Sequence, residues 1–392
     1  MSAPARVIAL YALMYAAFGV SSPFMPAFLE GRGLGPEQLG ILFATGTAVR
    51  LISGPLCGRL ADLTQALRAV LVICTALAAL VALGLLPAAG FWLLLTISAL
   101  QAAALAPITT LADTIAVAAS LPRGAAARFE YGWARGTGSA AFIVGTLLSG
   151  QVVSAWGLPS IVVLHAALLL GAAGAGMLLP DPARPEHPTA APAPPHHGGV
   201  RELLGLRPFR YVVLVSAFVL GSHGMHDAFA VIRWRAAGVT PGMASVLWSE
   251  SVAAEVVVFF AIGPWLVARL SPAGVIALAA AAGVLRWVAM ALTTELVVLA
   301  LTQPLHGLTF AALHLACMRL IAAIVPRHLA ATAQATYALG AAATTALLAL
   351  ASGGLYAKLG AEAFLVMALL SAVAAPVALR LRGIPVDHQV RR

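Results

Sequence analysis

Long apolar runs separated by short polar breaks are the dominant pattern of this chain. A transmembrane helix needs about 20 mostly apolar residues. By that criterion the sequence predicts an all-α membrane protein with twelve transmembrane helices. These cover residues 6–29, 37–61, 67–87, 91–118, 129–154, 159–179, 209–234, 243–268, 272–292, 295–318, 329–354 and 361–381.

A proline-rich segment, PDPARPEHPTAAPAPPHHGGVRELLGLRP, interrupts the pattern between the sixth and seventh runs. Its many prolines and polar residues exclude both a membrane span and a packed core. It divides the chain into an N-terminal six-helix bundle (1–180), a cytoplasmic linker (181–207) and a C-terminal six-helix bundle (208–392). This layout resembles the major facilitator fold, in which two related halves surround a substrate site near the bilayer midplane.

Composition supports the membrane assignment and excludes one class of partner. The 392 residues are 61% hydrophobic and only 9% charged, whereas soluble domains carry about 25% charged residues. The net charge of +9 could suggest nucleic acid. However, the arginines lie at the ends of apolar runs rather than on one face, so we expect no nucleic-acid partner.

The distribution of basic residues predicts the orientation of the chain. If both termini are cytoplasmic, the opposite side holds only Arg32, Arg233, Arg235 and Lys358 among the basic residues between runs. Cytoplasmic loops carry the excess of Lys and Arg, so we expect a multi-pass protein of the bacterial inner membrane with both termini cytoplasmic. The first run follows Arg6 without a cleavage site, and we interpret it as a retained span.

A loop motif follows the second run. GRLAD at residues 58–62 resembles the G-x-L-A-D core between helices two and three of major facilitator transporters. By that resemblance, Asp62 holds the cytoplasmic gate closed through helix N-termini and nearby arginines. Leu63 departs from the motif, because the family carries a basic residue there.

Three ionisable residues within the apolar runs of the first half are further candidates for function. Asp113 lies near the cytoplasmic end of the fourth run, and Arg135 lies more than one turn inside the fifth at similar depth. A salt bridge between them would lock the cytoplasmic side, which assigns both to the gate. Alternatively, Arg135 or Arg50, in the middle of the second run, binds a substrate carboxylate or hydroxyl group.

Runs eight to ten contain an acid, a cation and two imidazoles. Ionisable groups inside a span are costly and normally have a partner or face a wet cavity. A carboxyl group near a mobile cation can bind a proton and release it as the cation approaches. We therefore assign Glu255, Arg286, His306 and His314 to proton coupling, with a permanent Glu255–Arg286 pair as the alternative. Glu250, about 140° around the helix from Glu255, is placed nearer the outer mouth.

Three further residues of the second half are candidates for substrate contact: His223, Trp287 and Gln303. In GSHGMHD, His223 shares one helix face with His226 and Asp227 by three-and-four spacing. We expect His223 to line the cavity and to donate a hydrogen bond to Asp227. Trp287 offers an aromatic platform, and Gln303 lies in the middle of the tenth run. Metal binding would need another ligand, so we expect neither a metal nor a cofactor.

Several long strings resemble the phenylpropionate permease family, which is related to the oligosaccharide and nucleoside proton symporters of the major facilitator superfamily. The resemblance extends from about residue 10 to 375. The strings are AVRLISG, PITTLAD, FEYGWARGTGSAAFIVG, GSHGMHDAFAVIRWRAAG, LWSESVAAEVVVF, AAGVLRWVAMALTT and LHGLTFAALHLACMRLIAA. The fifth-run string also resembles the F-E-F-G-R-A-R segment of lactose permease, and Arg135 stands at its sugar-contacting arginine.

The resemblance implies that an acid on helix eight, an arginine on helix nine and a histidine on helix ten carry proton coupling. Glu255, Arg286 and His306 occupy those helices. The chain departs from the family at His226 and Asp227, where the family has aromatic residues. It also lacks the second glutamate that sugar symporters carry on helix ten.

These observations predict a monomeric secondary transporter in the lipid bilayer, not an enzyme. We expect proton-coupled symport of a small organic solute, such as phenylpropionate or another aromatic or carboxylic acid, by alternating access. The alternatives within transport are a sugar or nucleoside proton symporter and a drug or metabolite exporter. A membrane-embedded metalloenzyme and a non-transporting sensor are alternatives from other classes, and no H-E-x-x-H or nucleophile motif supports the enzyme.

Overall fold

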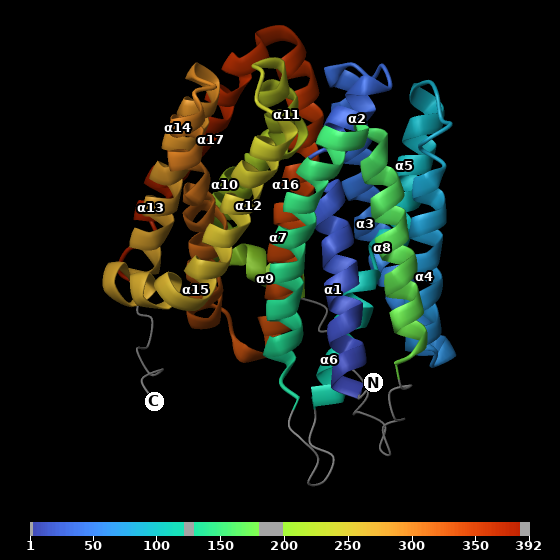
Figure 1. Cartoon of the computed structure of the whole chain (residues 1–392). Coiled ribbons are helices and arrows are strands. Elements are labelled where there is room, and N and C mark those ends of the chain that lie inside the picture. The colour runs from blue at the N-terminus through green and yellow to red at the C-terminus, as the bar shows by residue number, and fades with distance from the viewer. Residues whose placement is uncertain (1–2, 121–128, 180–198, 385–392) are drawn as a thin grey trace. The chain divides into compact units, whose positions relative to one another are not determined.

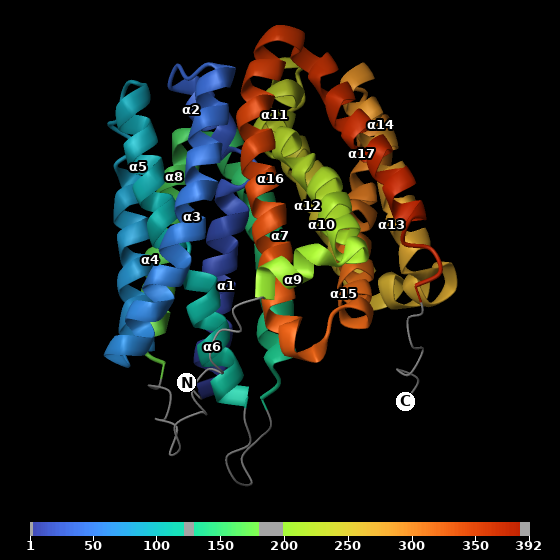
Figure 2. The same cartoon turned by 180° about the vertical axis from the view of Figure 1, so that it is seen from behind.

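The computed structural model describes residues 3–120, 129–179 and 199–384, and all regular structure in these ranges is helical (Figures 1 and 2). The helices before the proline-rich segment are α1 (Ala3–Ser21), α2 (Met25–Gly31), α3 (Pro36–Thr64), α4 (Leu67–Leu83), α5 (Phe91–Leu105), α6 (Ile108–Ser120), α7 (Tyr131–Trp156) and α8 (Pro159–Met177). The α-helices after it are α9 (Gly199–Gly205), α10 (Arg207–Gly221), α11 (His223–Ala236), α12 (Pro241–Val257), α13 (Gly263–Leu292), α14 (Leu296–Thr302), α15 (Leu313–Ile324), α16 (Ala330–Leu359) and α17 (Ala363–Leu379).

Short π- and 3₁₀-helices interrupt or connect the later α-helices. The π-turns are η1 (Val258–Ile262) and η3 (Leu308–Ala312). The 3₁₀-turns are η2 (Gln303–Leu305), η4 (Arg327–Leu329) and η5 (Gly360–Glu362). Both π-turns lie in the two helical segments that carry Glu255 and His306, and π-turns are frequent at functional sites.

Each of the twelve predicted runs coincides with helix in the structure. In the described ranges, nine continuous helical stretches are long and apolar enough to cross a membrane. Two of these, of 52 and 48 residues, each contain a backbone break where the sequence predicts a boundary between spans. The breaks lie at Ser271 (φ 63°) and Gly360 (φ 55°), whose positive φ interrupts the helical backbone.

The chain forms two compact units. Unit 1 contains Met1–Pro185 with Trp234–Ser249, and unit 2 contains Glu186–Arg233 with Glu250–Arg392. The predicted boundaries at 180, 181, 207 and 208 stay a prediction. Most of the predicted linker lies outside the described residues, but its last part includes the short helix α9.

Small residues bring the helices of unit 1 together. Helix α1 packs along α7 and α8, and α8 also packs on α4 (Figures 1 and 2). A side chain at Gly19 would collide with the backbone of Phe142, and one at Gly145 would collide with the backbone of Ala16. The α1–α7 contact therefore depends on glycine, as is common between transmembrane helices.

Unit 2 repeats this arrangement. Helix α10 packs along α16, and α13 packs along α17. At Gly221 an added Cβ would lie 2.7 Å from Leu348 Cδ1 and 2.9 Å from Thr344 Cγ2. The close α10–α16 contact in unit 2 is thus the counterpart of the α1–α7 contact in unit 1. Such related halves are typical of transporters built from internal repeats.

An arginine clamp also recurs in both units. Arg32, just after α2, donates to the carbonyl groups of Leu86 and Ala88 beyond the end of α4. Arg233, near the end of α11, donates to the carbonyl groups of Ala291 (3.1 Å) and Thr293 (3.4 Å) at the end of α13. In each unit the guanidinium therefore satisfies backbone acceptors that a helix end leaves free.

Many large apolar side chains point outward, as expected for a chain surrounded by lipid. The tryptophans near helix ends are among them: Trp92 at the start of α5 is 76% exposed, and Trp156 at the end of α7 is 75% exposed. Tryptophan is enriched where a membrane meets water. The positions of these two side chains therefore fit helices that span a bilayer.

Candidate transport site around Arg286

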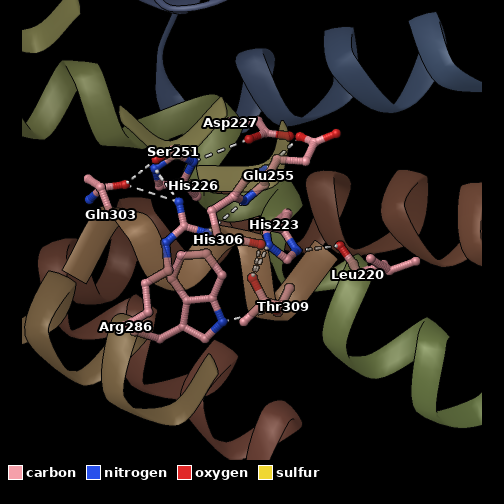
Figure 3. A network of polar contacts seen from close by, with 12 residues as sticks. Leu220, His223, His226, Asp227, Ser251, Glu255, Arg286, Gln303, His306 and Thr309 are labelled. Carbon is pink, nitrogen blue, oxygen red and sulfur yellow. Dashed lines mark hydrogen bonds and ion pairs between the residues drawn. The ribbon is translucent and has the colours of Figure 1, made fainter. Parts of the chain in front are cut away.

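A buried guanidinium lies at the centre of a polar network in unit 2 (Figure 3). Arg286, on α13, is fully buried. Its Nη1 donates to His306 Nδ1 at 3.2 Å, and its Nη2 donates to His226 Nε2 at 3.2 Å and to Gln303 Oε1 at 3.1 Å. One cation from the ninth predicted span thus contacts side chains from the seventh and tenth.

His306 connects Arg286 to Glu255. The second ring nitrogen of His306, Nε2, lies 3.4 Å from Glu255 Oε2. Gly307 makes this pairing possible, because a Cβ there would lie only 2.7 Å from the carbonyl oxygen of Ala254. The absence of a side chain at position 307 lets the tenth span approach α12 at the turn that carries Glu255.

His226 connects Arg286 to a second carboxylate. His226 Nδ1 lies 3.2 Å from Asp227 Oδ1. The side chain of Asp227 is 61% accessible, whereas that of His226 is 5% accessible. Asp227 also interacts electrostatically with Arg286 and His306. The sequence placed His226 and Asp227 on one helix face but did not include either in the predicted site.

His223 has different partners from those predicted. Its Nδ1 contacts the carbonyl group of Val219 at 3.0 Å, one turn earlier, and its Nε2 lies 3.0 Å from Thr309 Oγ1. The hydrogen bond expected between His223 and Asp227 is therefore replaced by the one between His226 and Asp227. The i, i+4 spacing was a sound guide to the helix face but not to the pairing, because both ring nitrogens of His223 are taken by other partners.

The indole ring of Trp287 packs against the guanidinium of Arg286. Its indole is fully buried, and its Nε1 donates to Ser222 Oγ at 2.9 Å. Arg286 Cζ lies 4.6 Å from the centre of the indole, and the ring of His223 meets it edge-on at 5.3 Å. Since the indole is enclosed by these groups, its predicted role as a substrate platform stays a prediction.

Gln303 is also fully buried. Its Oε1 accepts hydrogen bonds from Arg286 and from Ser251 Oγ, the latter at 3.0 Å. Because Arg286 can only donate, this contact defines which end of the amide faces it. Among the described residues, no acceptor contacts Gln303 Nε2 or Arg286 Nε. Both of these donors are buried, and the substrate role of Gln303 stays a prediction.

His314 lies apart from Arg286. Its ring packs against Phe259, with centroids 6.1 Å apart, and against Tyr337 at 6.0 Å. It remains close enough to Glu255 for an electrostatic interaction. The hydrogen bonds of the described residues connect His306, but not His314, to the guanidinium. The coupling role of His314 stays a prediction.

In unit 1, the structure contains the predicted ion pair between Asp113 and Arg135, with Nη1 and Oδ1 3.7 Å apart. Two tyrosines that the sequence did not single out complete this cluster. Tyr11 donates to Asp113 Oδ1, and Arg135 donates to the hydroxyl of Tyr15. The Arg135 guanidinium also lies 5.5 Å from the centre of the Tyr15 ring. The gate role of the pair and the substrate role of Arg135 both stay predictions.

The last two predicted residues lie on α3. Arg50 is exposed within this helix, and no described carboxylate pairs with it. Asp62 is exposed in the last turn, where its backbone carbonyl accepts from Gln65, the residue that ends the helix. The gate role of Asp62 stays a prediction.

Comparison with known proteins identifies the family to which the chain is similar. The model of the MFS_1 like family matches residues 5–366. The chain is 31% identical over 373 residues to the "Probable 3-phenylpropionic acid transporter" of Escherichia coli K12, covering 92% of this chain and 93% of that protein. It is 28% identical over 211 residues to a maltose permease of Geobacillus stearothermophilus, covering 54% of this chain and 51% of that protein.

Solved structures share the fold. The nucleoside transporter NupG matches with a TM-score of 0.79 at 16% identity, covering 98% of this chain and all of that chain. A bacterial homologue of the human lysosomal transporter Spinster, in an inward-facing conformation, matches with a TM-score of 0.73 at 16% identity, covering 97% and 96%. The match of the family model along nearly the whole chain, the relative of similar length and the helical fold lead to one conclusion: this chain is a multi-pass membrane transporter that belongs to the MFS_1 like family.

Proposed function

We propose that the protein is a proton-coupled symporter that imports a small organic anion, an aromatic carboxylic acid in particular, across the bacterial inner membrane. The observation that carries this proposal is the connection from Glu255 through His306 to the buried Arg286. A carboxyl group in contact with an imidazole, itself bound to a cation, can gain and lose a proton as these contacts change. The solute and the proton are the partners, and the protein works as a monomer with both termini cytoplasmic.

The proposed solute charge rests on Arg50. This guanidinium lies within a predicted span, where an ionisable group needs a compensating partner. Among the described residues no carboxylate pairs with Arg50, whereas Arg135 has Asp113. A substrate carboxylate would supply the missing charge. The name of the Escherichia coli relative, a transporter of an aromatic acid, agrees with this solute class.

Alternating access follows from the architecture of the family. Transporters with related halves expose a central site first to one side of the membrane and then to the other. In our proposal, Asp62, Asp113 and Arg135 close the cytoplasmic side. Protonation of the Glu255–His306–Arg286 group permits the loaded protein to change from the outward-facing to the inward-facing conformation. A sugar symporter is the second candidate, because Asp227 offers an accessible hydrogen-bonding carboxylate where the family has aromatic residues.

The test of coupling uses purified protein in liposomes and labelled 3-phenylpropionate. Wild type should accumulate the acid only with an inward proton gradient. Glu255→Gln should lose accumulation but keep exchange of labelled for unlabelled solute, whereas Glu250→Gln, on the same helix, should behave as wild type. Gradient-driven accumulation by Glu255→Gln would refute the coupling assignment.

The test of solute charge uses Arg50→Gln. If Arg50 binds the carboxylate, this variant should weaken binding of the acid at least about tenfold, which corresponds to about 1.4 kcal/mol. Binding of the uncharged amide of the same acid should change little, because it presents no charge to Arg50. Equal effects on the acid and the amide would show that Arg50 does not select an anion.

A further inference from the structure

The hydrogen bonds of Arg286 determine where the protons of its two histidine partners lie. A guanidinium can only donate hydrogen bonds. His306 Nδ1 and His226 Nε2, which face Arg286 at 3.2 Å, must therefore both accept. An imidazole that accepts through one nitrogen is neutral and carries its proton on the other. Both histidines are thus neutral in this structure.

The protonated nitrogen of each histidine faces a carboxylate. His306 Nε2 lies 3.4 Å from Glu255 Oε2, and His226 Nδ1 lies 3.2 Å from Asp227 Oδ1. The network thus has two arms, Arg286–His306–Glu255 and Arg286–His226–Asp227. In each arm a neutral imidazole lies between the guanidinium and a carboxylate (Figure 3). Four helical segments contribute: α11 carries both His226 and Asp227, and α12, α13 and the tenth span carry one residue each.

The charges of this network do not balance when both acids are ionised. Arg286 contributes one positive charge, and Asp227 and Glu255 contribute two negative charges. Two carboxylates that share one cation favour a state in which one of them is protonated. Of the other described groups in this network, Gln303 is uncharged, and His223 contacts the backbone of Val219 and the hydroxyl of Thr309.

The remaining titratable groups lie outside the two arms. Glu250 is on the same helix as Glu255 but about 140° around it. His314, on α15, packs between the rings of Phe259 and Tyr337 and interacts electrostatically with Glu255, but no hydrogen bond of the described residues connects it to Arg286. Arg233, at the far end of α11, donates to the end of α13. Among the described residues, Arg286 is therefore the cation that hydrogen bonds connect to both arms.

We propose that Asp227 is a second proton-binding carboxylate of this site, and that Asp227 and Glu255 hold one proton between them while Arg286 compensates the ionised member. The proton adds to a carboxylate oxygen and leaves from it, with no other bond made or broken. Asp227 is the entry point, because its side chain is 61% accessible and that of Glu255 is 25% accessible. The shared proton stands on the geometry alone, and its use in transport rests on the proposed symport.

Thermal unfolding of purified protein tests the charge balance. Asp227→Asn and Glu255→Gln each leave one carboxylate for one guanidinium, so each should lower the melting temperature only slightly. The double variant leaves Arg286 without a counter-ion and should lose more than the sum of the two single losses. Additive losses would overturn the shared-charge proposal. Glu295→Gln, an exposed acid before α14, is the control for a simple loss of one carboxylate.

Infrared difference spectra between acidic and alkaline pH test the shared proton without any substrate. Wild type should show one carbonyl band of a protonated carboxyl group that disappears as pH rises. That band should be absent from both Asp227→Asn and Glu255→Gln and retained in Glu250→Gln. A band that persists unchanged in Asp227→Asn would assign the proton to Glu255 alone and overturn the proposal.

Uptake assays separate this inference from the proposed function. Asp227→Asn should lose gradient-driven accumulation of 3-phenylpropionate but keep exchange. If wild type accumulates the acid and Asp227→Asn does so equally, the role of Asp227 is wrong and the symport proposal stands. If wild type shows no gradient dependence while the spectra and the unfolding data agree with a shared proton, the symport proposal is wrong and the shared proton stands.

Discussion

Gly307 controls the distance between the two helices that carry Glu255 and His306. A Cβ at this position would lie 2.7 Å from the Ala254 carbonyl oxygen, 2.8 Å from Val258 Cγ2 and 3.0 Å from the Ala254 carbonyl carbon, whereas ordinary contacts begin at 3.4 Å. Two of the three atoms belong to the backbone and cannot rotate away. In Gly307→Ala, the tenth span must therefore move away from α12 by roughly 0.7 Å.

This movement would act on both stability and coupling. Overpacking of a close contact costs about 1–3 kcal/mol. The gap between His306 Nε2 and Glu255 Oε2, 3.4 Å in the wild type, would widen to roughly 4 Å, beyond hydrogen-bonding distance. We therefore expect Gly307→Ala to have a lower melting temperature and a reduced ratio of gradient-driven accumulation to exchange.

The matched control is Gly354→Ala on α16, where an added Cβ meets no atom within 4 Å. Alanine favours a helix over glycine by about 1 kcal/mol, so this variant should be as stable as wild type or more stable. Thermal melts and liposome uptake of both variants decide the matter. A Gly307→Ala protein with wild-type stability and accumulation would show that helix separation at this point does not set the Glu255–His306 contact.

The remaining predictions concern the support of the site and the helix ends. Trp287→Phe removes the indole donor to Ser222 and leaves a gap beside the network. The free energy of unfolding should therefore fall by about 1–3 kcal/mol in thermal melts. An unchanged melt would contradict the role of that hydrogen bond. Arg233→Ala, and its counterpart Arg32→Ala in unit 1, should each lower the free energy of unfolding by about 1–2 kcal/mol, because each removes donors from carbonyl groups at a helix end. Similar melts for wild type and both variants would argue against a stabilising role of these arginine clamps. Asp113→Asn should cost less than about 1 kcal/mol, because the pair with Arg135 is partly exposed, and a larger loss would mark the cluster as a main stabilising contact.

The helical class, the approximate bounds of the apolar spans and the family could be predicted from the sequence alone. These follow from local rules, because each membrane span must be long, apolar and able to satisfy its backbone hydrogen bonds within one helix. The breaks at Ser271 and Gly360 fall where the pattern predicts boundaries between spans. The residues that belong to the site, Glu255, Arg286 and His306, were also recognisable, because an ionisable group within an apolar run is itself a signal.

Which of these ionisable side chains contact one another depends on the tertiary structure. Arg286 and His226 are separated by 60 residues, and their contact depends on the rotation and depth of two helices that no local pattern specifies. The π-turns η1 and η3 add a further shift to the helix faces of the eighth and tenth spans, so spacing alone could not separate His306 from His314. The contact of His223 with Thr309, 86 residues later in the chain, likewise leaves His226 rather than His223 in contact with Asp227. Pairing across helices depends on packing over the whole unit, whereas the existence of each helix depends on its own residues.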